Sequence, residues 1–222
     1  MAEDVVILGT HAVPVWPQGQ KVHARGDPII RTTRFDDIEQ YHPRLIAHIL
    51  DLERERHQGK HYFRGACGTK FYHPERWNLP EANLLHARAL ALFRLVVEQK
   101  EAIADLSWAN VYRRGDYCMP HSHLRANASV VYFLENGDSD PDDPLSGRFC
   151  IVDPRLPACC GHEPGRMTKP LVPACAPGTM LIFPSQVVHS VNPYTGTNPR
   201  ITLSWNISEF TIPGAPLADR QT

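Results

Sequence analysis

The stretch GDYCMPHSHLRANASVVYFLENG (Gly115–Gly137) carries two histidines one residue apart, directly ahead of a run that alternates like a β-strand. Residues two apart in a strand project from the same face, so His121 and His123 are expected to point to one side. Their Cα atoms would then lie about 7 Å apart, a gap that imidazole nitrogens bound to one metal can close. The pair alone is weak evidence, because the chain has 12 histidines.

A second stretch, APGTMLIFPSQVVHSVNPYTGTNPRITLSWNI (residues 176–207), supplies a third histidine and a cation. His189 follows a turn at Pro184-Ser185, and Arg200 opens a strand that alternates strictly. The polar face of that strand consists of Arg200, Thr202, Ser204 and Asn206. A strand that is polar on one face and apolar on the other is typical of a barrel around a wet cavity, although a solvent-exposed outer sheet would look similar.

From Ser107 onward, period-two runs separated by glycine, proline and asparagine indicate a series of short strands. The candidate strands are SWANVY (107–112), MPHSHL (119–124), SVVYFL (129–134), GRFCIVD (147–153), GTMLIFPS (178–185) and RITLSWNI (200–207). Short strands in such a series pack into a barrel or a two-sheet roll.

The first half of the chain has a different texture. Residues 1–35 predict one or two short strands, and residues 36–105 are helical in pattern, with apolar residues at helical spacing in 36–56 and again in 81–106. Residues 59–80, between those runs, are rich in glycine and aromatic residues, which suits either a surface loop or a lid that faces substrate. We predict a single domain over residues 1–222, with N-terminal strands and supporting helices in 1–106 and a β core in 107–210.

The composition is that of an ordinary globular protein, with 222 residues, 21% charged, 42% hydrophobic and a formal net charge of −1. This near-neutral charge argues against nucleic acid or an anionic membrane as a partner. The chain has no apolar run long enough to span a bilayer and no signal-peptide pattern, so we expect a cytoplasmic protein with free thiols. A zinc site built from Cys159, Cys160, His162 and Cys175 is disfavoured, because adjacent cysteines lack the usual ligand spacing.

Residues 107–208 resemble the double-stranded β-helix of iron(II)/2-oxoglutarate-dependent oxygenases, and within them the group of prolyl hydroxylases and small bacterial 2OG-Fe(II) oxygenases. The matching motifs are NVYRRGDYCMPHSH (110–123), SVVYFL, GTMLIFPSQVVH (178–189) and an arginine, Arg200, eleven residues after His189. The resemblance implies a mainly β fold with supporting helices, of the jelly-roll or cupin-like kind. It also implies an enzyme that uses Fe(II), 2-oxoglutarate and O2 to oxidise a C–H bond of a small-molecule or amino-acid-type substrate, with release of succinate and CO2. Whether the protein forms a homodimer is left open.

The sequence departs from that family at one metal-ligand position. The family supplies a His-x-Asp or His-x-Glu pair and a distal histidine, but the carboxylate position here is His123. We favour a three-histidine iron site made by His121, His123 and His189. The alternative is that one of the pair lies outside the coordination sphere and the carboxylate is absent or replaced by water. Asp116 is an odd number of residues from His121, so in a continuous strand it would face away.

The other roles follow from the resemblance and from shared strand faces. Arg200 is expected to fork onto the distal carboxylate of 2-oxoglutarate, because a planar guanidinium matches a carboxylate bidentately. Thr202 and Ser204, on the same face, can add hydroxyl groups. Relatives place a tyrosine on that carboxylate, which points to Tyr132 unless Phe133 occupies the equivalent register. The remaining candidates for the pocket wall, or for ordinary strand packing, are Asn110 and Tyr112.

Two other functions remain open at this point. Gly115, five further residues and then the histidine pair match the opening of the first cupin motif, although the glutamate expected after the pair is missing. A cupin would be a metal-dependent dioxygenase or isomerase that does not use 2-oxoglutarate and needs no arginine near Arg200. The second alternative is a catalytically inactive β-roll that serves as a binding module.

Overall fold

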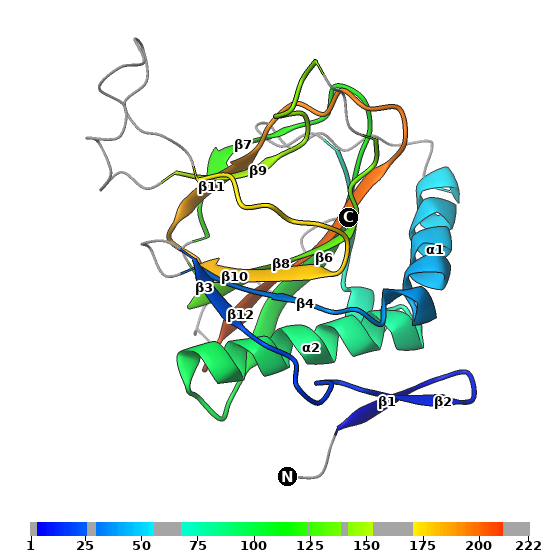
Figure 1. Ribbon diagram of the computed structural model, residues 1–222, viewed down its shortest axis with the longest axis vertical. Helices are drawn as coiled ribbons and strands as arrows, with labels where there is room; N and C mark the ends of the chain where they lie inside the picture. Colours follow the sequence, from blue (N-terminus) through cyan, green and yellow to red (C-terminus); the bar gives the residue numbers. More distant parts are fainter. Residues whose placement is uncertain are drawn as a thin grey trace.

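The computed structural model describes residues 4–25, 30–55, 68–123, 125–138, 142–152 and 171–210. In these residues a larger and a smaller β-sheet form two layers, and two helices lie on the side of the larger sheet away from the smaller one (Figure 1). All strand pairs in both sheets are antiparallel.

The elements follow one another in this order. The N-terminal part consists of β1 (Val5–Leu8), β2 (His11–Pro14), β3 (His23–Arg25), β4 (Ile30–Arg34), the 3₁₀ turn η1 (Ile38–Gln40) and α1 (His42–Glu55). Then come β5 (Thr69–Tyr72), the 3₁₀ turn η2 (Pro74–Arg76) and α2 (Pro80–Val97). The β core consists of β6 (Ile103–Tyr112), β7 (Cys118–His121), β8 (Ala128–Glu135), β9 (Phe149–Val152), β10 (Thr179–Pro184), β11 (Val188–Val191) and β12 (Arg200–Ser208).

The strand orders show how distant segments are brought together. The larger sheet has seven strands in the order β3-β4-β10-β8-β12-β6-β5, and the smaller sheet has three in the order β7-β11-β9. A separate hairpin, β1–β2, lies beneath α2 (Figure 1). Because β12 pairs with both β8 and β6, it is an interior strand of the larger sheet, next to the central strand β8. The mainly β class with supporting helices is confirmed.

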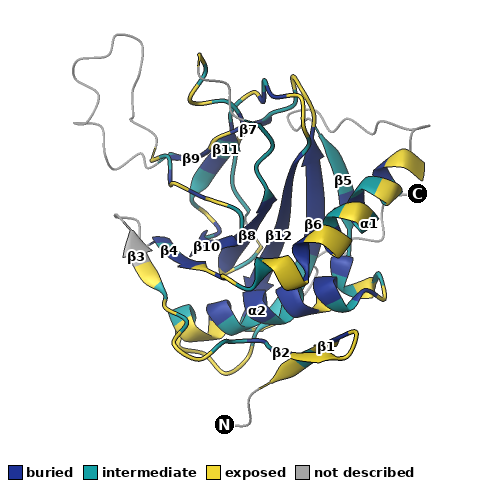
Figure 2. Ribbon diagram, turned by 45° about the vertical axis from the view of Figure 1, so that its right-hand side comes forward, coloured by how far each residue is buried: buried dark blue, intermediate teal, exposed yellow. Residues whose placement is uncertain are grey.

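Strand β12 separates two hydrophobic cores. Its apolar residues Ile201, Leu203, Trp205 and Ile207 pack into the first core, which also contains the buried face of α2 (Figure 2). The second core lies on the other face of the sheet and includes residues of β8, β9 and β11. The apolar side chains on the sheet-facing side of α2 are buried, which explains the helical spacing seen in the sequence.

The structure differs from the sequence prediction in several places. The second helix is shorter than the apolar pattern indicated, because α2 ends at Val97, where Glu98 has a left-handed backbone with φ 58°. Residues 103–106 of that pattern belong to β6 instead. Strands β5 and β11 were not predicted, and residues 4–35 hold four strands rather than one or two. These strands are only three to five residues long and depend on pairing with distant partners.

The helices and the cysteines bear on two expectations from the sequence, the absence of a membrane span and the state of the thiols. Neither described helix combines the length and apolar character that crossing a bilayer requires. Cys118, Cys150 and Cys175 are buried and are not part of a disulfide. Cys159, Cys160 and His162, the other members of the disfavoured zinc site, lie outside the described residues, as do residues 59–67 of the expected loop or lid.

Candidate active site

His121 and His189 meet because β7 and β11 are neighbours in the smaller sheet. The two residues are directly opposite each other in this antiparallel pair, so their side chains project from the same face. Their ring centroids are 4.3 Å apart. The pairing of β7 with β11 therefore brings together two residues that are far apart in the sequence. The sequence indicated that the two histidines meet, but not which strands pair to bring them together.

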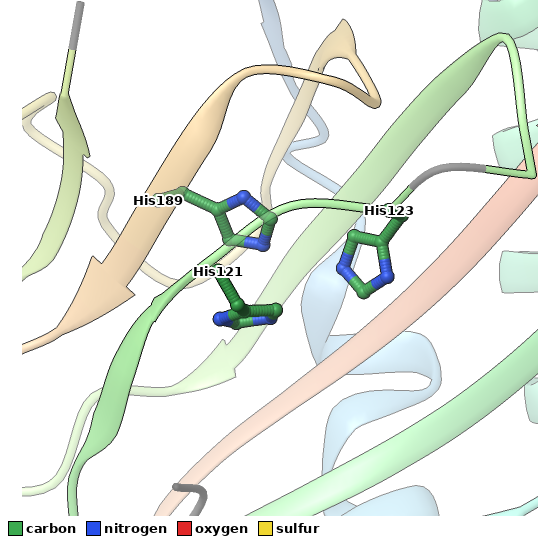
Figure 3. Close-up of side chains that lie close together, drawn as sticks. All are labelled: His121, His123 and His189. Carbon is green, nitrogen blue, oxygen red and sulfur yellow. The ribbon is translucent and has the colours of Figure 1, made fainter.

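His123 reaches the same point by a different route from the one predicted. Strand β7 ends at His121, so His123 is not part of it and the two-residue strand argument does not apply. Instead, the backbone N–H of His123 donates to the carbonyl oxygen of Ser185 at 2.8 Å, in the turn between β10 and β11. Its ring lies 5.0 Å from that of His121 and 5.1 Å from that of His189, and Figure 3 shows the three rings facing one another.

The three imidazoles lie close enough together to bind one metal ion. One nitrogen from each ring can be chosen so that all three lie within 4.8 Å of one another. Among the described residues no carboxylate joins this group. Asp116 lies in the turn before β7, where its Oδ2 accepts a hydrogen bond from the backbone N–H of Arg113 at 2.8 Å.

Two of the rings are oriented by carbonyl groups. The Nδ1 atom of His121 lies 2.8 Å from the carbonyl oxygen of Met119, and Nδ1 of His189 lies 3.0 Å from that of Val187. A carbonyl oxygen can only accept, so each Nδ1 must carry the hydrogen and donate. The lone pair of each neutral ring is then on Nε2. Hydrogen-bond acceptors beside Nδ1 commonly impose this arrangement on metal-binding histidines.

The third ring is oriented by Asn206, on the polar face of β12. As placed in the structure, Nδ2 of Asn206 donates to Nδ1 of His123 at 3.3 Å, and Oδ1 of Asn206 accepts a hydrogen bond from the hydroxyl of Ser129 at 3.1 Å. Half a turn of the amide exchanges its nitrogen and oxygen, and the serine hydroxyl can donate or accept, so both contacts survive the exchange. With the amide oxygen towards His123, all three rings offer Nε2; with the nitrogen towards it, His123 does not.

Burial keeps these imidazoles neutral. It is the main cause that lowers the pKa of His189 to about 4 and the pKa of His123 to about 3, and it also lowers the pKa of His121. The positive charge of Lys70 adds to the lowering in all three. A metal ion arriving at neutral pH therefore has no protons to displace from the ring nitrogens that it binds.

Most of the predicted pocket residues line one cavity together with His121 and His189. Cross-strand pairing of β6 with β12 places Tyr112 opposite Arg200 and Asn110 opposite Thr202. Asn110 also donates to the hydroxyl of Thr202 at 3.3 Å. The complete lining is Lys70, Trp108, Asn110, Tyr112, Cys118, His121, Val131, Phe149, His189, Val191, Arg200, Thr202 and Ser204. Sequence reasoning missed Lys70, Trp108 and Cys118, of which only Trp108 lay in a predicted strand.

Arg200 is a buried cation at one end of this cavity. It is 4% exposed, and its guanidinium carbon lies 5.0 Å from the ring centre of Tyr112 and 5.8 Å from that of Phe133. Its Nη1 is buried without a hydrogen-bond partner, and within the described ranges Arg200 forms no ion pair. Burial lowers the pKa of Arg200. A desolvated guanidinium with an unused donor fits a carboxylate ligand.

Tyr132 is not part of the cavity, so its assignment to the 2-oxoglutarate carboxylate was wrong. Its side chain lies in the first core, on the helix side of β8, where its hydroxyl bonds the hydroxyl of Tyr41 at 2.9 Å and Nε2 of His42 at 2.6 Å. The neighbouring Phe133 belongs to the second core and is paired with Thr202. Phe133 thus takes the register that a cavity-facing tyrosine would need.

The hydroxyl of Tyr132 belongs to a buried chain of hydrogen bonds that begins at Arg88. Arg88 forms an ion pair with Asp37 and donates to the hydroxyl of Tyr41 at 3.0 Å. Since an arginine can only donate, Tyr41 is free to donate onward to Tyr132, and Tyr132 to His42. His42 is then the final acceptor, which requires a neutral ring. Burial likewise lowers the pKa of His42 from 6.5 to about 4.

This chain predicts a pH dependence of stability. The folded state resists protonation of His42 between pH 6.5 and about 4, whereas the unfolded chain takes up the proton below 6.5. Unfolding therefore binds protons in this range, and stability falls as the pH falls, by at most about 1.4 kcal/mol per pH unit for this one group. In urea titrations of the iron-loaded protein, His42→Gln should flatten the decline relative to wild type; two parallel curves would contradict the prediction.

Comparisons with known proteins agree with this geometry. Residues 106–206, slightly less than half of the chain, match the family model described as "Putative 2OG-Fe(II) oxygenase". No protein of curated function matches the sequence.

Three solved structures illustrate the fold. A prolyl-4-hydroxylase of Pseudomonas putida is 16% identical over 86% of this chain and 94% of its own, with a TM-score of 0.55. HygX from Streptomyces hygroscopicus, with nickel and 2-oxoglutarate bound, is 13% identical over 87% and 89%, with a TM-score of 0.56. The non-heme α-ketoglutarate-dependent epimerase SnoN from nogalamycin biosynthesis is 10% identical over 81% and 77%, with a TM-score of 0.60.

At these identities the structural matches establish the double-stranded β-helix, as expected from the sequence, and the family match adds the chemistry. The match excludes neither a hydroxylase nor another outcome of C–H oxidation, since the matched folds include a hydroxylase and an epimerase. It favours the oxygenase over the cupin or inactive module that the sequence left open. Residues 106–206 match the model of the 2OG-Fe(II) oxygenase family, and this match supports an enzyme that works with Fe(II), 2-oxoglutarate and O2.

Proposed function

We propose that this oxygenase holds Fe(II) with the Nε2 atoms of His121, His123 and His189 and binds 2-oxoglutarate with Arg200. Its reaction is the oxidation, in the simplest case the hydroxylation, of a C–H bond in a small-molecule or amino-acid-type substrate. When bound, iron would let O2 act as the oxidant, with 2-oxoglutarate oxidised to succinate and CO2 and the C–H bond oxidised by the second oxygen atom. The observation that carries the proposal is the buried, unpartnered Nη1 of Arg200, which lines the same cavity as His121 and His189 of the three-histidine cluster.

The donor set suits Fe(II). Imidazole nitrogens bind iron well, and three of them on one side leave positions for 2-oxoglutarate and O2. Since all three ligands are neutral, the ion keeps its full +2 charge until the 2-oxoglutarate dianion binds. A neutral ligand set therefore strengthens the binding of an anion beside the metal compared with the usual set that contains a carboxylate.

The chain's own residues do the rest of the work at the cosubstrate end. Arg200 can donate two parallel hydrogen bonds to the distal carboxylate of 2-oxoglutarate. Thr202 and Ser204 lie on the same face of β12 and offer hydroxyl groups. The ring of Tyr112 packs on the guanidinium and keeps its plane in place. Asn110 fixes the hydroxyl of Thr202 through its hydrogen bond.

The role of Asn206 gives a prediction for the metal set. In the turned orientation, in which its amide oxygen faces His123, Asn206 keeps the hydrogen on Nδ1 of that ring. Asn206→Leu removes this acceptor, and we expect the affinity for Fe(II) to fall by about tenfold to hundredfold. Asn206→Asp, which keeps an acceptor there, should restore most of it. The measurement is anaerobic Fe(II) titration by calorimetry.

Ser129→Ala is the matched control, because it removes the other partner of Asn206 without touching a histidine. Wild-type iron affinity in Asn206→Leu would mean that His123 is not held in the tautomer that a ligand needs. His123 would then lie outside the coordination sphere.

Several finer points belong to the same proposal. The near-neutral charge of the chain supports a small substrate rather than a nucleic acid. We further propose one oxygenase domain, with the helices that cover the first core serving as its support, and a cytoplasmic location. Whether the enzyme works as a homodimer is settled by its mass in solution.

The experiment that tests the proposed function is a search for turnover. The iron-loaded enzyme is supplied with 2-oxoglutarate, O2 and a panel of metabolites, and succinate is measured by mass spectrometry. Succinate release that a panel member stimulates, and that Arg200→Met abolishes, is the expected result. Iron binding without any succinate release, basal or stimulated, would instead favour a cupin-type enzyme that does not use 2-oxoglutarate.

A further inference from the structure

A second cation reaches the cavity from the edge of the larger sheet. Lys70 lies on β5, where it is paired with Asn110, which is paired in turn with Thr202. Paired residues of neighbouring strands share a face, so Lys70 lies on the cavity face of the sheet. It is one of the residues that line the cavity together with His121 and Arg200.

The ammonium group of Lys70 lies on the metal side of the cavity. Its Nζ lies 5.4 Å from the ring centre of Trp108, whose ring in turn lies 5.7 Å from that of His123. The positive charge of Lys70 is near enough to act on the pKa of all three histidines. Arg200 is paired with Tyr112, two residues along β6 from the Asn110 that is paired with Lys70, so the two cations lie at different places along the cavity wall.

The ring under Lys70 has an unused donor. Trp108 is 6% exposed, and its Nε1 is buried with no hydrogen-bond partner among the described residues. Leaving a buried N–H unpaired is unfavourable, so such a group is expected to meet an acceptor in the working state. An ammonium and an N–H donor in the same wall suit an anionic oxygen ligand.

The charge balance of the cavity points the same way. Lys70 and Arg200 both line it, and in the described part of the chain no aspartate or glutamate does. Fe(II) held by three neutral imidazoles adds further positive charge. Two cations and a bound Fe(II) in one partly desolvated cavity favour anionic ligands.

Exposure distinguishes the two cations. Arg200 is buried, whereas Lys70 is only half-buried. A ligand that enters after 2-oxoglutarate therefore meets the more exposed cation, Lys70. The cosubstrate, by contrast, has its own cation in the buried Arg200.

From these observations we propose that Lys70 and the N–H of Trp108 bind a carboxylate of the prime substrate, so that the substrate is a small carboxylic acid. This inference rests on the proposed function and names its substrate class. Lys70 acts here as a specificity-determining residue, which places the reacting C–H bond beside the metal by holding the acid group at a fixed distance from it.

The test uses the full chain loaded anaerobically with Fe(II) and 2-oxoglutarate. The probes are N-acetylated amino acids and, for each, the matching primary amide, which has the same shape without the charge. Binding is followed by the change in the visible iron-to-2-oxoglutarate charge-transfer band, and succinate release is measured after O2 is admitted. The variants are Lys70→Met, Lys70→Arg and Trp108→Phe, with the exposed Lys100→Met as the matched control.

The expected result is that acids bind to wild type about tenfold to hundredfold more tightly than their amides, and that Lys70→Met removes this difference. Lys70→Arg should retain most of the preference for acids, Trp108→Phe should lose part of it, and Lys100→Met should behave as wild type.

Three results would overturn the subsite while leaving the oxygenase intact. They are equal binding of acids and amides across the whole panel at millimolar concentration, an undiminished preference for acids in Lys70→Met, and a loss of 2-oxoglutarate affinity in Lys70→Met as large as the loss of acid binding. The last would assign Lys70 to the cosubstrate. Absence of the band in wild type would instead refute the proposed function itself, and the subsite with it.

Discussion

Replacing Arg200 with methionine is expected to weaken 2-oxoglutarate binding between about thirtyfold and several thousandfold, because truncating one partner of a buried charge pair costs about 2–5 kcal/mol. The guanidinium is almost fully buried, and among the described residues it forms no ion pair that would compete for it. Iron affinity should change little, because Arg200 is not one of the clustered imidazoles. The measurement is an anaerobic titration of the iron-loaded protein with 2-oxoglutarate, followed by the visible charge-transfer band.

The same substitution should leave the ligand-free protein at least as stable as wild type. Arg200 holds a desolvated charge, and its Nη1 lacks a partner, so its removal takes away an unfavourable contribution rather than a favourable one. Arg148, an exposed arginine whose charge acts on Arg200, provides the matched control. Arg148→Met should retain 2-oxoglutarate affinity. Unchanged affinity in Arg200→Met would show that the distal carboxylate binds elsewhere.

The second large effect concerns the departure from the family's ligand set. His123→Ala should lower the affinity for Fe(II) by at least about a hundredfold, since losing a hydrogen-bond partner of a ligand already costs about tenfold to hundredfold. His121→Ala and His189→Ala should have effects of the same size. His123→Asp restores the carboxylate that the family usually supplies, and should keep iron binding. Iron content after anaerobic loading is measured by mass spectrometry.

The control for these substitutions is His11→Ala, because His11 is exposed on β2. If His123→Ala retained full iron and full turnover, the three-histidine set would be refuted. Two imidazoles and water would then complete the coordination, which is the alternative that the sequence left open.

The alternation of β12 made the cavity predictable from the sequence. In that strand polar residues alternate with apolar ones, and the structure places the apolar set in the first core and Arg200, Thr202 and Ser204 on the cavity wall. In a strand with one polar and one apolar face, the alternation shows which residues face the core, because only the apolar face can be buried among apolar groups. The gathering of His121 and His189 was predictable in the same sense, since each stood in a motif of one family.

Strand β8 could not be read in this way. Residues 130–134 are apolar or aromatic at every position, and both faces are buried, so period two gives no sign of which face is which. Only the pairing of Thr202 with Phe133 and of Leu203 with Tyr132 shows that Tyr132 lies on the helix side. The pairing of β12 with β8 also shifts register between Ile201 and Thr202. This shift makes the faces of β8 harder to predict, because a one-residue slip exchanges them.

His123 and Lys70 show two further limits. His123 was placed by a strand argument, yet the strand ends at His121, and the ring is held by a backbone hydrogen bond to Ser185 instead. Lys70 lay in an aromatic stretch without periodicity, and it reaches the cavity only through the pairing of β5 with β6. Both depend on contacts between segments distant in the sequence, which local patterns do not contain.

Diffraction from anaerobic crystals grown with Fe(II) and 2-oxoglutarate, with anomalous data at the iron edge, tests the central claim most directly. The account predicts one iron peak about 2.0–2.2 Å from the Nε2 atoms of His121, His123 and His189, with the distal carboxylate of 2-oxoglutarate on Arg200. Iron bound by only two of the three imidazoles, or a 2-oxoglutarate molecule that does not touch Arg200, would contradict it.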